Sequence, residues 1–204
     1  MLSGPVVGIG DSITWGSDSS DPPATSYVGY AARLLGTEAI NLGIPAAFTD
    51  RMTYEVASVP ETAAAVLLCA GTNDVGVAAG NANADEAVAK VRAVMPTADA
   101  LFAALRERLP TMPLVVVTVR DLGRARADYP NTTADGLTAA SRAWNAHIRA
   151  LAARADAALV DVEHDAQWYV RDEYAPGGIH PLDACAERLA HAVVAALGAI
   201  LTRA

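Results

Sequence analysis

A serine, an asparagine and a histidine, far apart in the chain, carry side chains suited to nucleophilic chemistry. Ser12 follows an apolar run of small and β-branched residues, Pro5 to Ile9, that is typical of a buried strand. A serine in the turn after such a strand lies at the edge where open α/β folds place their ligands. The neighbouring Asp11 is expected to hold this turn through hydrogen bonds. Because a hydroxyl is a weak nucleophile, Ser12 needs a nearby base.

Three later segments could complete the chemistry. Gly43 follows the second apolar segment, Asn73 follows the third, and His180 lies near the end of the chain. An imidazole can accept the serine proton, and a backbone N–H at a glycine or a side-chain amide can stabilise an oxyanion. Each residue also has an ordinary alternative, because Ser12 could cap a helix and Asn73 could simply form a turn.

His180 is the best placed of the four histidines. It directly precedes Pro181, at the start of the last predicted helix, where proline is well tolerated. His147 and His191 lie inside predicted helices, and His164 lies in an acidic loop. We therefore expect His180 to be the base.

Four segments, each after an apolar run, occur in the order Gly10-Asp11-Ser12, Gly43, Gly71-Thr72-Asn73-Asp74 and His180-Pro181. This pattern resembles the SGNH hydrolases, also called the GDSL esterase/lipase family, from Gly10 to Pro181. The resemblance implies a three-layer α/β/α fold with about five parallel strands in flavodoxin-like order. It also implies Ser12 as nucleophile, His180 as base, and an oxyanion hole formed by Ser12, Gly43 and Asn73. No metal and no organic cofactor are implied.

The resemblance further implies an esterase that works through an acyl-enzyme on Ser12. Family members act on lipids, thioesters, acetylated sugars and simple esters, so the partner is expected to be a small-molecule ester. The chain has no long insertion that could form a lid. This favours a small or short-acyl substrate, such as an acetyl ester, a simple ester or a lysophospholipid-like molecule.

Two positions depart from the family pattern. The family usually carries an aspartate three residues before the histidine to orient the imidazole, and this chain has Gly177 there. The family's second segment often continues to another glycine, and this chain has Ala46 there. We expect the second departure to be mild, with the Gly43 N–H as the donor.

The missing acid leaves three arrangements open. A backbone carbonyl could orient His180 in a Ser12–His180 dyad. The carboxylate of Asp172 or Glu173, the nearest in sequence, could reach the ring. Alternatively, the site could be impaired and the chain could be a binding protein with an SGNH fold, since loss of the acid's function costs about 10⁴ in kcat in a serine protease.

Strands and helices must alternate to bring these residues together. Apolar runs predict strands at Val6–Ile9, Ala39–Leu42, Ala65–Cys69, Leu114–Val119 and Ala158–Val162. Helical patterns are found at Tyr27–Leu35, Asp50–Ala57, Ala84–Leu109, Gly136–Arg154 and Leu182–Leu201. Pro96 predicts two helices within Ala84–Leu109, and Gly76–Asn83 and Asp121–Gly136 are predicted loops. The alternation favours a parallel sheet covered on both faces.

Length and composition agree with one globular domain over residues 1–204. Apolar residues make up 52% of the chain, charged residues 19%, and the net charge is −8 without a basic block, which argues against nucleic acid as a partner. The absence of a G-x-G-x-x-G or P-loop pattern argues against a nucleotide or flavin binder. Cys69 and Cys185 are expected to be buried thiols. We expect a cytoplasmic protein without a membrane span, and the sequence indicates no oligomeric state.

Overall fold

The computed structural model describes residues 2–125 and 127–202, which form a five-stranded parallel sheet with helices on both faces. The strands are β1 (Val6–Gly10), β2 (Ala39–Asn41), β3 (Ala65–Cys69), β4 (Leu114–Val117) and β5 (Ala158–Val160). Their order is β2-β1-β3-β4-β5, and every neighbouring pair is parallel. The predicted flavodoxin-like order is confirmed.

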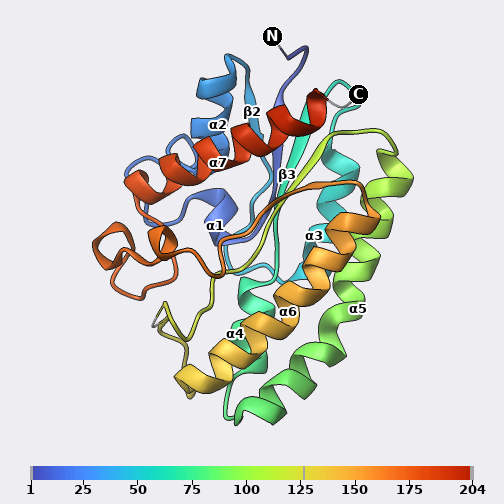
Figure 1. Cartoon of the computed structure of the whole chain (residues 1–204). Coiled ribbons are helices and arrows are strands. Elements are labelled where there is room, and N and C mark those ends of the chain that lie inside the picture. The colour runs from blue at the N-terminus through green and yellow to red at the C-terminus, as the bar shows by residue number, and fades with distance from the viewer. Residues whose placement is uncertain (1, 126, 203–204) are drawn as a thin grey trace.

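The helices form two layers, one on each face of the sheet (Figure 1). One layer holds α2 (Tyr27–Leu35) and α7 (Asp183–Leu201), and the other holds α3 (Thr49–Glu55), α5 (Ala84–Arg108) and α6 (Ala134–Arg154). The short helices α1 (Ser12–Trp15) and α4 (Thr72–Ala78) follow β1 and β3 at the carboxyl edge of the sheet. Short 3₁₀ turns span Val56–Ser58, Ala166–Tyr169 and Arg171–Glu173.

Strand side chains alternate between two apolar cores. Val7 and Leu68 belong to the core under α3, α5 and α6, whereas Val6 and Leu67 belong to the core under α2 and α7. Because helices cover both faces, each strand reads as a continuous apolar run. This is why the positions of the strands could be predicted from the sequence.

The last helix, α7, is long and apolar enough to cross a bilayer by length and composition alone. In this structure its Val193 and Leu197 are fully buried, in the same core as Tyr27 of α2. Helix α2 follows β1 and α7 follows β5, and both strands run in the same direction. The loops that precede the two helices therefore lie at the same edge of the sheet.

Two predicted features differ from the structure. Helix α5 is continuous through Pro96, where we predicted two helices. A capping box of Asn83 and Glu86 begins this helix, and its buried face, which includes Leu101, packs in the core shared with α3 and α6. Tertiary packing therefore outweighs the cost of the proline. The loop predicted over Gly76–Asn83 is also partly wrong, because α4 extends to Ala78.

The exposed Pro96 should lower the stability of the fold. Pro96→Ala restores a helical N–H without removing a buried contact, so the free energy of unfolding should rise by about 2 kcal/mol after allowance for the greater freedom of the unfolded chain. Urea unfolding followed by circular dichroism measures the change. An unchanged or lower unfolding midpoint would mean that the proline is compensated locally.

Candidate active site

Ser12 is the first residue of α1, directly after β1. The Asp11 side chain caps this helix by accepting a hydrogen bond from the Ile13 N–H at 2.9 Å. A Cβ added at Gly10 would lie 2.1 Å from Oγ1 of Thr14, so only glycine permits so tight a turn. As the first residue of the helix, Ser12 has an N–H without an acceptor inside the helix.

The ring of His180 lies between a hydroxyl and a carboxylate. Its Nε2 is 2.9 Å from Oγ of Ser12, and its Nδ1 is 2.6 Å from Oδ2 of Asp18. Since a carboxylate oxygen only accepts hydrogen bonds, the Nδ1–H donates to Asp18 and Nε2 is left to accept the serine proton. The structure therefore brings together the predicted nucleophile and base, and adds an acid that the sequence analysis missed.

Asp18 lies in the loop that joins α1 to α2, and the start of α7 holds that loop in place. The Ser20 N–H and hydroxyl donate to the two carboxylate oxygens of Asp183 at 2.9 and 2.5 Å. These bonds are the main reason that the pKa of Asp183 is lowered. Asp183 follows His180 by three residues, so one short segment positions the histidine and anchors the loop of its acid.

The expectation that Asp172 orients the histidine is wrong. Asp172 is exposed in a 3₁₀ turn and makes no hydrogen bond to His180 among the described residues. The alternative, Glu173, pairs with Arg188 instead. A backbone carbonyl is excluded from Nδ1 as well, because Asp18 occupies that position. Nearness in sequence was a poor guide because Asp18, which is 162 residues away, is brought closer by the fold.

The structure also contradicts the predicted role of the Gly43 N–H. This group donates to the side-chain oxygen of Asn41 at 2.9 Å, in the local turn that asparagine favours. The Asn41 amide in turn donates to the carbonyl of Thr14 at 2.7 Å. A Cβ at Gly43 would lie 2.4 Å from the Trp15 nitrogen. Gly43 therefore packs closely against the backbone at the end of α1.

Asn73, the second residue of α4, keeps a free N–H in its side chain. One hydrogen of its amide donates to the carbonyl of Ala47 at 2.9 Å, which leaves the other without an acceptor among the described residues. Asp74 accepts from the N–H and hydroxyl of Thr49 at 3.1 and 2.9 Å. These bonds hold the segment after β2 beside α4.

Ala46 lies in this segment after β2. It has a left-handed φ of 63°, and its N–H has no acceptor among the described residues.

The start of α4 depends on a close contact between backbone and indole. Gly71 has a φ of 111°, and a Cβ there would lie 2.0 Å from Nε1 of Trp144. The indole N–H donates to the carbonyl of Ala70 at 3.1 Å. Trp144 is fully buried on α6, so that helix fixes the place from which Asn73 projects.

A buried carboxyl group lies directly behind the nucleophile. Asp11 is fully buried, and desolvation raises its pKa to about 6 against the opposing hydrogen bond from Ile13. Its second oxygen and the buried hydroxyl of Thr72 form no hydrogen bond of normal geometry among the described residues, although Thr72 lies near enough to Asp11 to oppose the rise of its pKa. This group therefore titrates at a pH where ordinary aspartates are already ionised.

Comparisons with known proteins identify a family and similar folds. The model of the GDSL-like lipase/acylhydrolase family matches residues 9–188. Among solved structures, a protein from Lactobacillus plantarum superposes with a TM-score of 0.72 at 19% identity, with 98% of each chain covered. Phospholipase A1 from Streptomyces albidoflavus NA297 gives 0.70 at 17% identity, with 97% of this chain and 99% of that one covered. An extracellular lipase from Streptomyces rimosus gives 0.70 at 20% identity, with 96% and 99% covered. No curated protein matches the sequence.

The raised pKa of Asp11 predicts a pH-dependent stability. The pKa of Asp11 is about 6 in the folded chain, against an ordinary value of 3.8. Between pH 3.8 and pH 6, Asp11 is therefore mostly protonated in the folded chain and mostly ionised in the unfolded chain. The free energy of unfolding should therefore fall as pH rises through this window, by about 3 kcal/mol for this group. Asp11→Asn keeps the capping oxygen but cannot ionise, so relative to wild type it should gain about that much between pH 4 and pH 7.

Urea unfolding at several pH values measures the difference between variant and wild type. Asp172→Asn, at an exposed position, is the matched control and should leave the pH profile unchanged. A pH profile for Asp11→Asn that parallels wild type would show that Asp11 is ionised throughout.

Proposed function

The chain belongs to the GDSL-like lipase/acylhydrolase family, and from this membership we propose that it hydrolyses carboxylic esters through an acyl-enzyme on Ser12. The observation that carries the proposal is the hydrogen-bonded chain from Ser12 Oγ to His180 Nε2 and from His180 Nδ1 to Asp18. This is the arrangement in which a histidine can take a serine proton while a carboxylate stabilises the resulting imidazolium.

In the first half of the reaction, Nε2 of His180 accepts the hydroxyl proton as Ser12 Oγ bonds to the ester carbonyl carbon. His180 then returns the proton to the departing alcohol oxygen, and the acyl group stays on Ser12. In the second half a water molecule loses its proton to His180 and attacks the acyl carbon. The carboxylic acid leaves, and Ser12 regains its proton. Asp18 holds the ring throughout and takes no proton.

Three N–H donors are proposed to stabilise the oxyanion. Ser12 supplies its backbone N–H and Asn73 supplies the free hydrogen of its amide, as the sequence predicts. Since the Gly43 N–H is already bonded to Asn41, Ala46 takes its place in this proposal. The support for Ala46 is its unpaired N–H and its position next to Ala47, which Asn73 binds directly.

A short acyl group is the proposed preference. An apolar cavity of about 30 Å³ has among its lining residues Ile13, Ile179 and Pro181, the chain neighbours of Ser12 and His180. A cavity this small supports a short acyl group over a long chain. An acetyl ester is therefore the first substrate to test.

The proposal predicts that Ser12→Ala abolishes ester hydrolysis while the fold stays intact. The measurements are kcat/KM on nitrophenyl acetate and nitrophenyl octanoate, with circular dichroism as the test of folding. Wild type should prefer the acetate, and an organophosphonate inhibitor should add its mass at Ser12.

The matched control is Ser17→Ala, which changes a serine in the loop after α1 that makes no side-chain hydrogen bond among the described residues. This variant should keep the wild-type rate. Full turnover in Ser12→Ala would overturn the mechanism. A folded wild-type protein that turns over neither ester and resists the phosphonate would favour the binding-protein alternative.

A further inference from the structure

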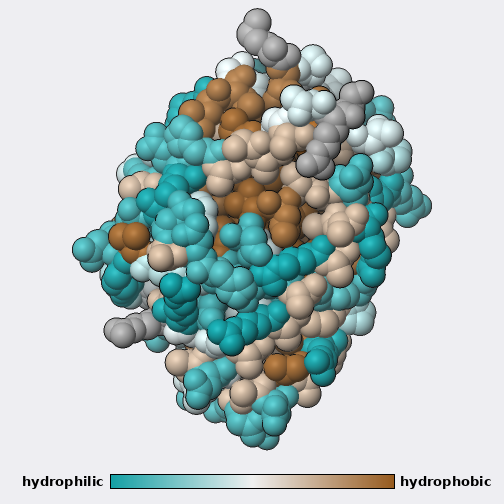
Figure 2. Space-filling model, viewed as in Figure 1, coloured by the Kyte–Doolittle hydropathy of each residue, from teal (hydrophilic) through white to brown (hydrophobic). Residues whose placement is uncertain are grey.

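A cavity of about 200 Å³ opens between the segment after β4 and the segment after β5. Its lining residues are Arg120, Arg124, Ala125, Tyr169, Arg171 and Tyr174. Half of them are arginines, and none is an aspartate or glutamate. The molecular surface around these segments, below and to the left of α7, is largely hydrophilic (Figure 2).

Arg120 is the buried member of this group, with only 8% of the residue exposed. Its guanidinium donates to the carbonyls of Trp168, at 3.1 Å, and of Gly178, and it lies 3.5 Å above the ring of Tyr174. No carboxylate lies within ion-pair distance of it among the described residues. Buried charges are usually paired, so a buried arginine whose partners are all neutral is unusual.

The other two arginines are more exposed but are also satisfied only by neutral groups. Arg124 donates to the carbonyl of His164 at 3.0 Å and stacks 4.2 Å above the ring of Tyr169. Arg171 donates to the carbonyl of Ala175 at 3.0 Å. In the described part of the chain neither forms an ion pair. Each guanidinium has five N–H groups, so all three keep donors for a ligand.

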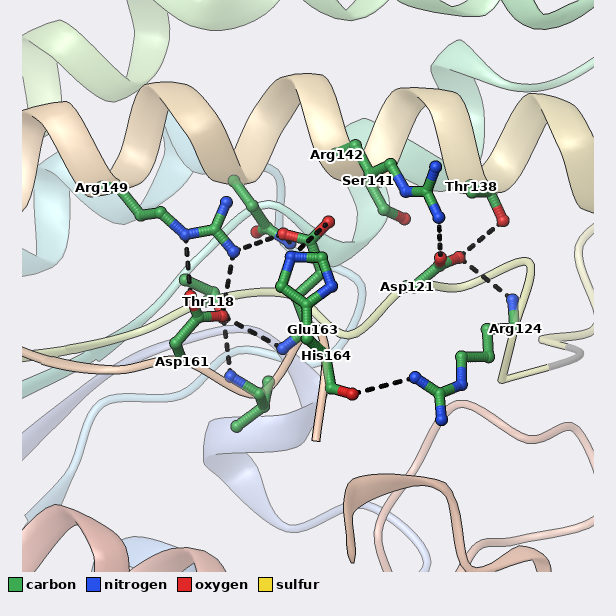
Figure 3. Close-up of polar contacts among 12 residues, drawn as sticks. Thr118, Asp121, Arg124, Thr138, Ser141, Arg142, Arg149, Asp161, Glu163 and His164 are labelled. Atoms are coloured by element: carbon green, nitrogen blue, oxygen red, sulfur yellow. Dashed lines mark hydrogen bonds and ion pairs between the residues drawn. The ribbon is translucent and has the colours of Figure 1, made fainter. Parts of the chain in front are cut away.

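Three of the neighbouring acids, Asp121, Glu163 and Glu173, already have other partners. The carboxylate of Asp121 accepts from the Thr138 hydroxyl at 2.7 Å and lies 3.9 Å from Arg142 (Figure 3). That of Glu163 accepts from Arg149, also drawn in Figure 3, and Glu173 pairs with Arg188 on α7. In Figure 3 the Arg124 guanidinium points to the His164 carbonyl and away from the Asp121 carboxylate. Three guanidinium groups thus face one cavity without an ion pair among the described residues, in a chain whose net charge is −8.

We propose that this cavity is a binding site for a phosphate-type oxyanion, held by Arg120, Arg124 and Arg171. Guanidinium groups match the geometry of phosphate oxygens by forming paired, charge-assisted hydrogen bonds. The cavity is several times the share of one water molecule in the liquid, which is enough for a tetrahedral oxyanion. Burial lowers the pKa of Arg120, yet an arginine stays charged in proteins, so the cavity retains its positive charge.

Two lining residues of the cavity also contact the segment that leads to His180. Arg120 also lines the apolar cavity that includes Ile13, and it donates to the Gly178 carbonyl two residues before His180. Arg171 donates to the Pro176 carbonyl in the same segment. The oxyanion could therefore be a free anion that binds beside the active site, or a phosphate group on the ester substrate.

Thermal unfolding in sodium phosphate, against sodium chloride at equal ionic strength, tests binding. The Tm of wild type should rise with phosphate and saturate, and Arg124→Gln and Arg171→Gln should each reduce the apparent affinity at least about tenfold. Arg92→Gln is the matched control, because Arg92 is exposed on α5 and lies outside the lining of the cavity. This control should keep the wild-type response.

The outcome that overturns the site is a wild-type Tm that responds to phosphate no more than to chloride. A phosphate response that survives in both cavity variants would overturn it equally. The thermal measurement needs no turnover, so it remains a test of the site even if the proposed esterase activity fails.

A kinetic arm, which rests on the proposed function, distinguishes the two sources. If the anion belongs to the substrate, Arg124→Gln should raise KM for an acetate ester of a phosphorylated alcohol about tenfold and leave KM for nitrophenyl acetate unchanged. If the anion is free, both esters should respond alike to the variant and to added phosphate.

Discussion

The ring of His180 hydrogen-bonds to Ser12 and Asp18 at the same time. The elements at the carboxyl edge of the sheet hold these three residues in the positions that both bonds require. Ser12 approaches Nε2 from the end of β1, and Asp18 approaches Nδ1 from the loop that leaves α1. Both contacts depend on where the start of α7 lies, and α7 is fixed by its packing against α2 and the sheet. The bond from Ser20 to Asp183 ties the acid's loop to that same helix start. Since the Asp18 side chain is 55% exposed, anchoring of its loop helps to keep it beside the histidine.

The two sides of the Ser12–His180 pair differ in charge. On the sheet side of Ser12 the carboxyl group of Asp11 is buried without a full set of partners, and its raised pKa records that cost. On the other side, the segment that leads to His180 is held by guanidinium groups through backbone carbonyls. Arg120 and Arg171 thus have two roles, since they hold the segment before the histidine and line the cavity proposed for an oxyanion. Neutral carbonyls accept hydrogen bonds from these guanidinium groups but do not neutralise their charge.

The sequence predicted what depends on local pattern and missed what depends on long-range contact. The parallel sheet followed from alternating apolar runs, and its strand order followed from the family resemblance. Ser12, Asn73 and His180 could be chosen because each follows or precedes a recognisable element. Asp18 could not be chosen in this way, because it is 162 residues from His180 in the sequence. The polar loop that holds Asp18, six residues after the serine, was nevertheless a usable signal. The predicted role of the Gly43 N–H was wrong because this group donates to the Asn41 side chain. The sequence alone does not show which acceptor a backbone N–H uses. Pro96 misled because packing of α5 outweighs a local helix-breaking preference.

Asp18 orients His180 in place of the aspartate that Gly177 replaces, and kcat on nitrophenyl acetate at neutral pH is the decisive measurement of this role. We expect kcat to fall by about 10²–10⁴ in Asp18→Ala and to change by less than about twofold in Asp172→Ala. We also expect partial recovery of kcat in Asp18→Ala/Gly177→Asp, since a Cβ at Gly177 would meet no atom within 4 Å and an aspartate fits there. A wild-type kcat in Asp18→Ala, or a large loss in Asp172→Ala, would show that Asp18 does not orient the histidine.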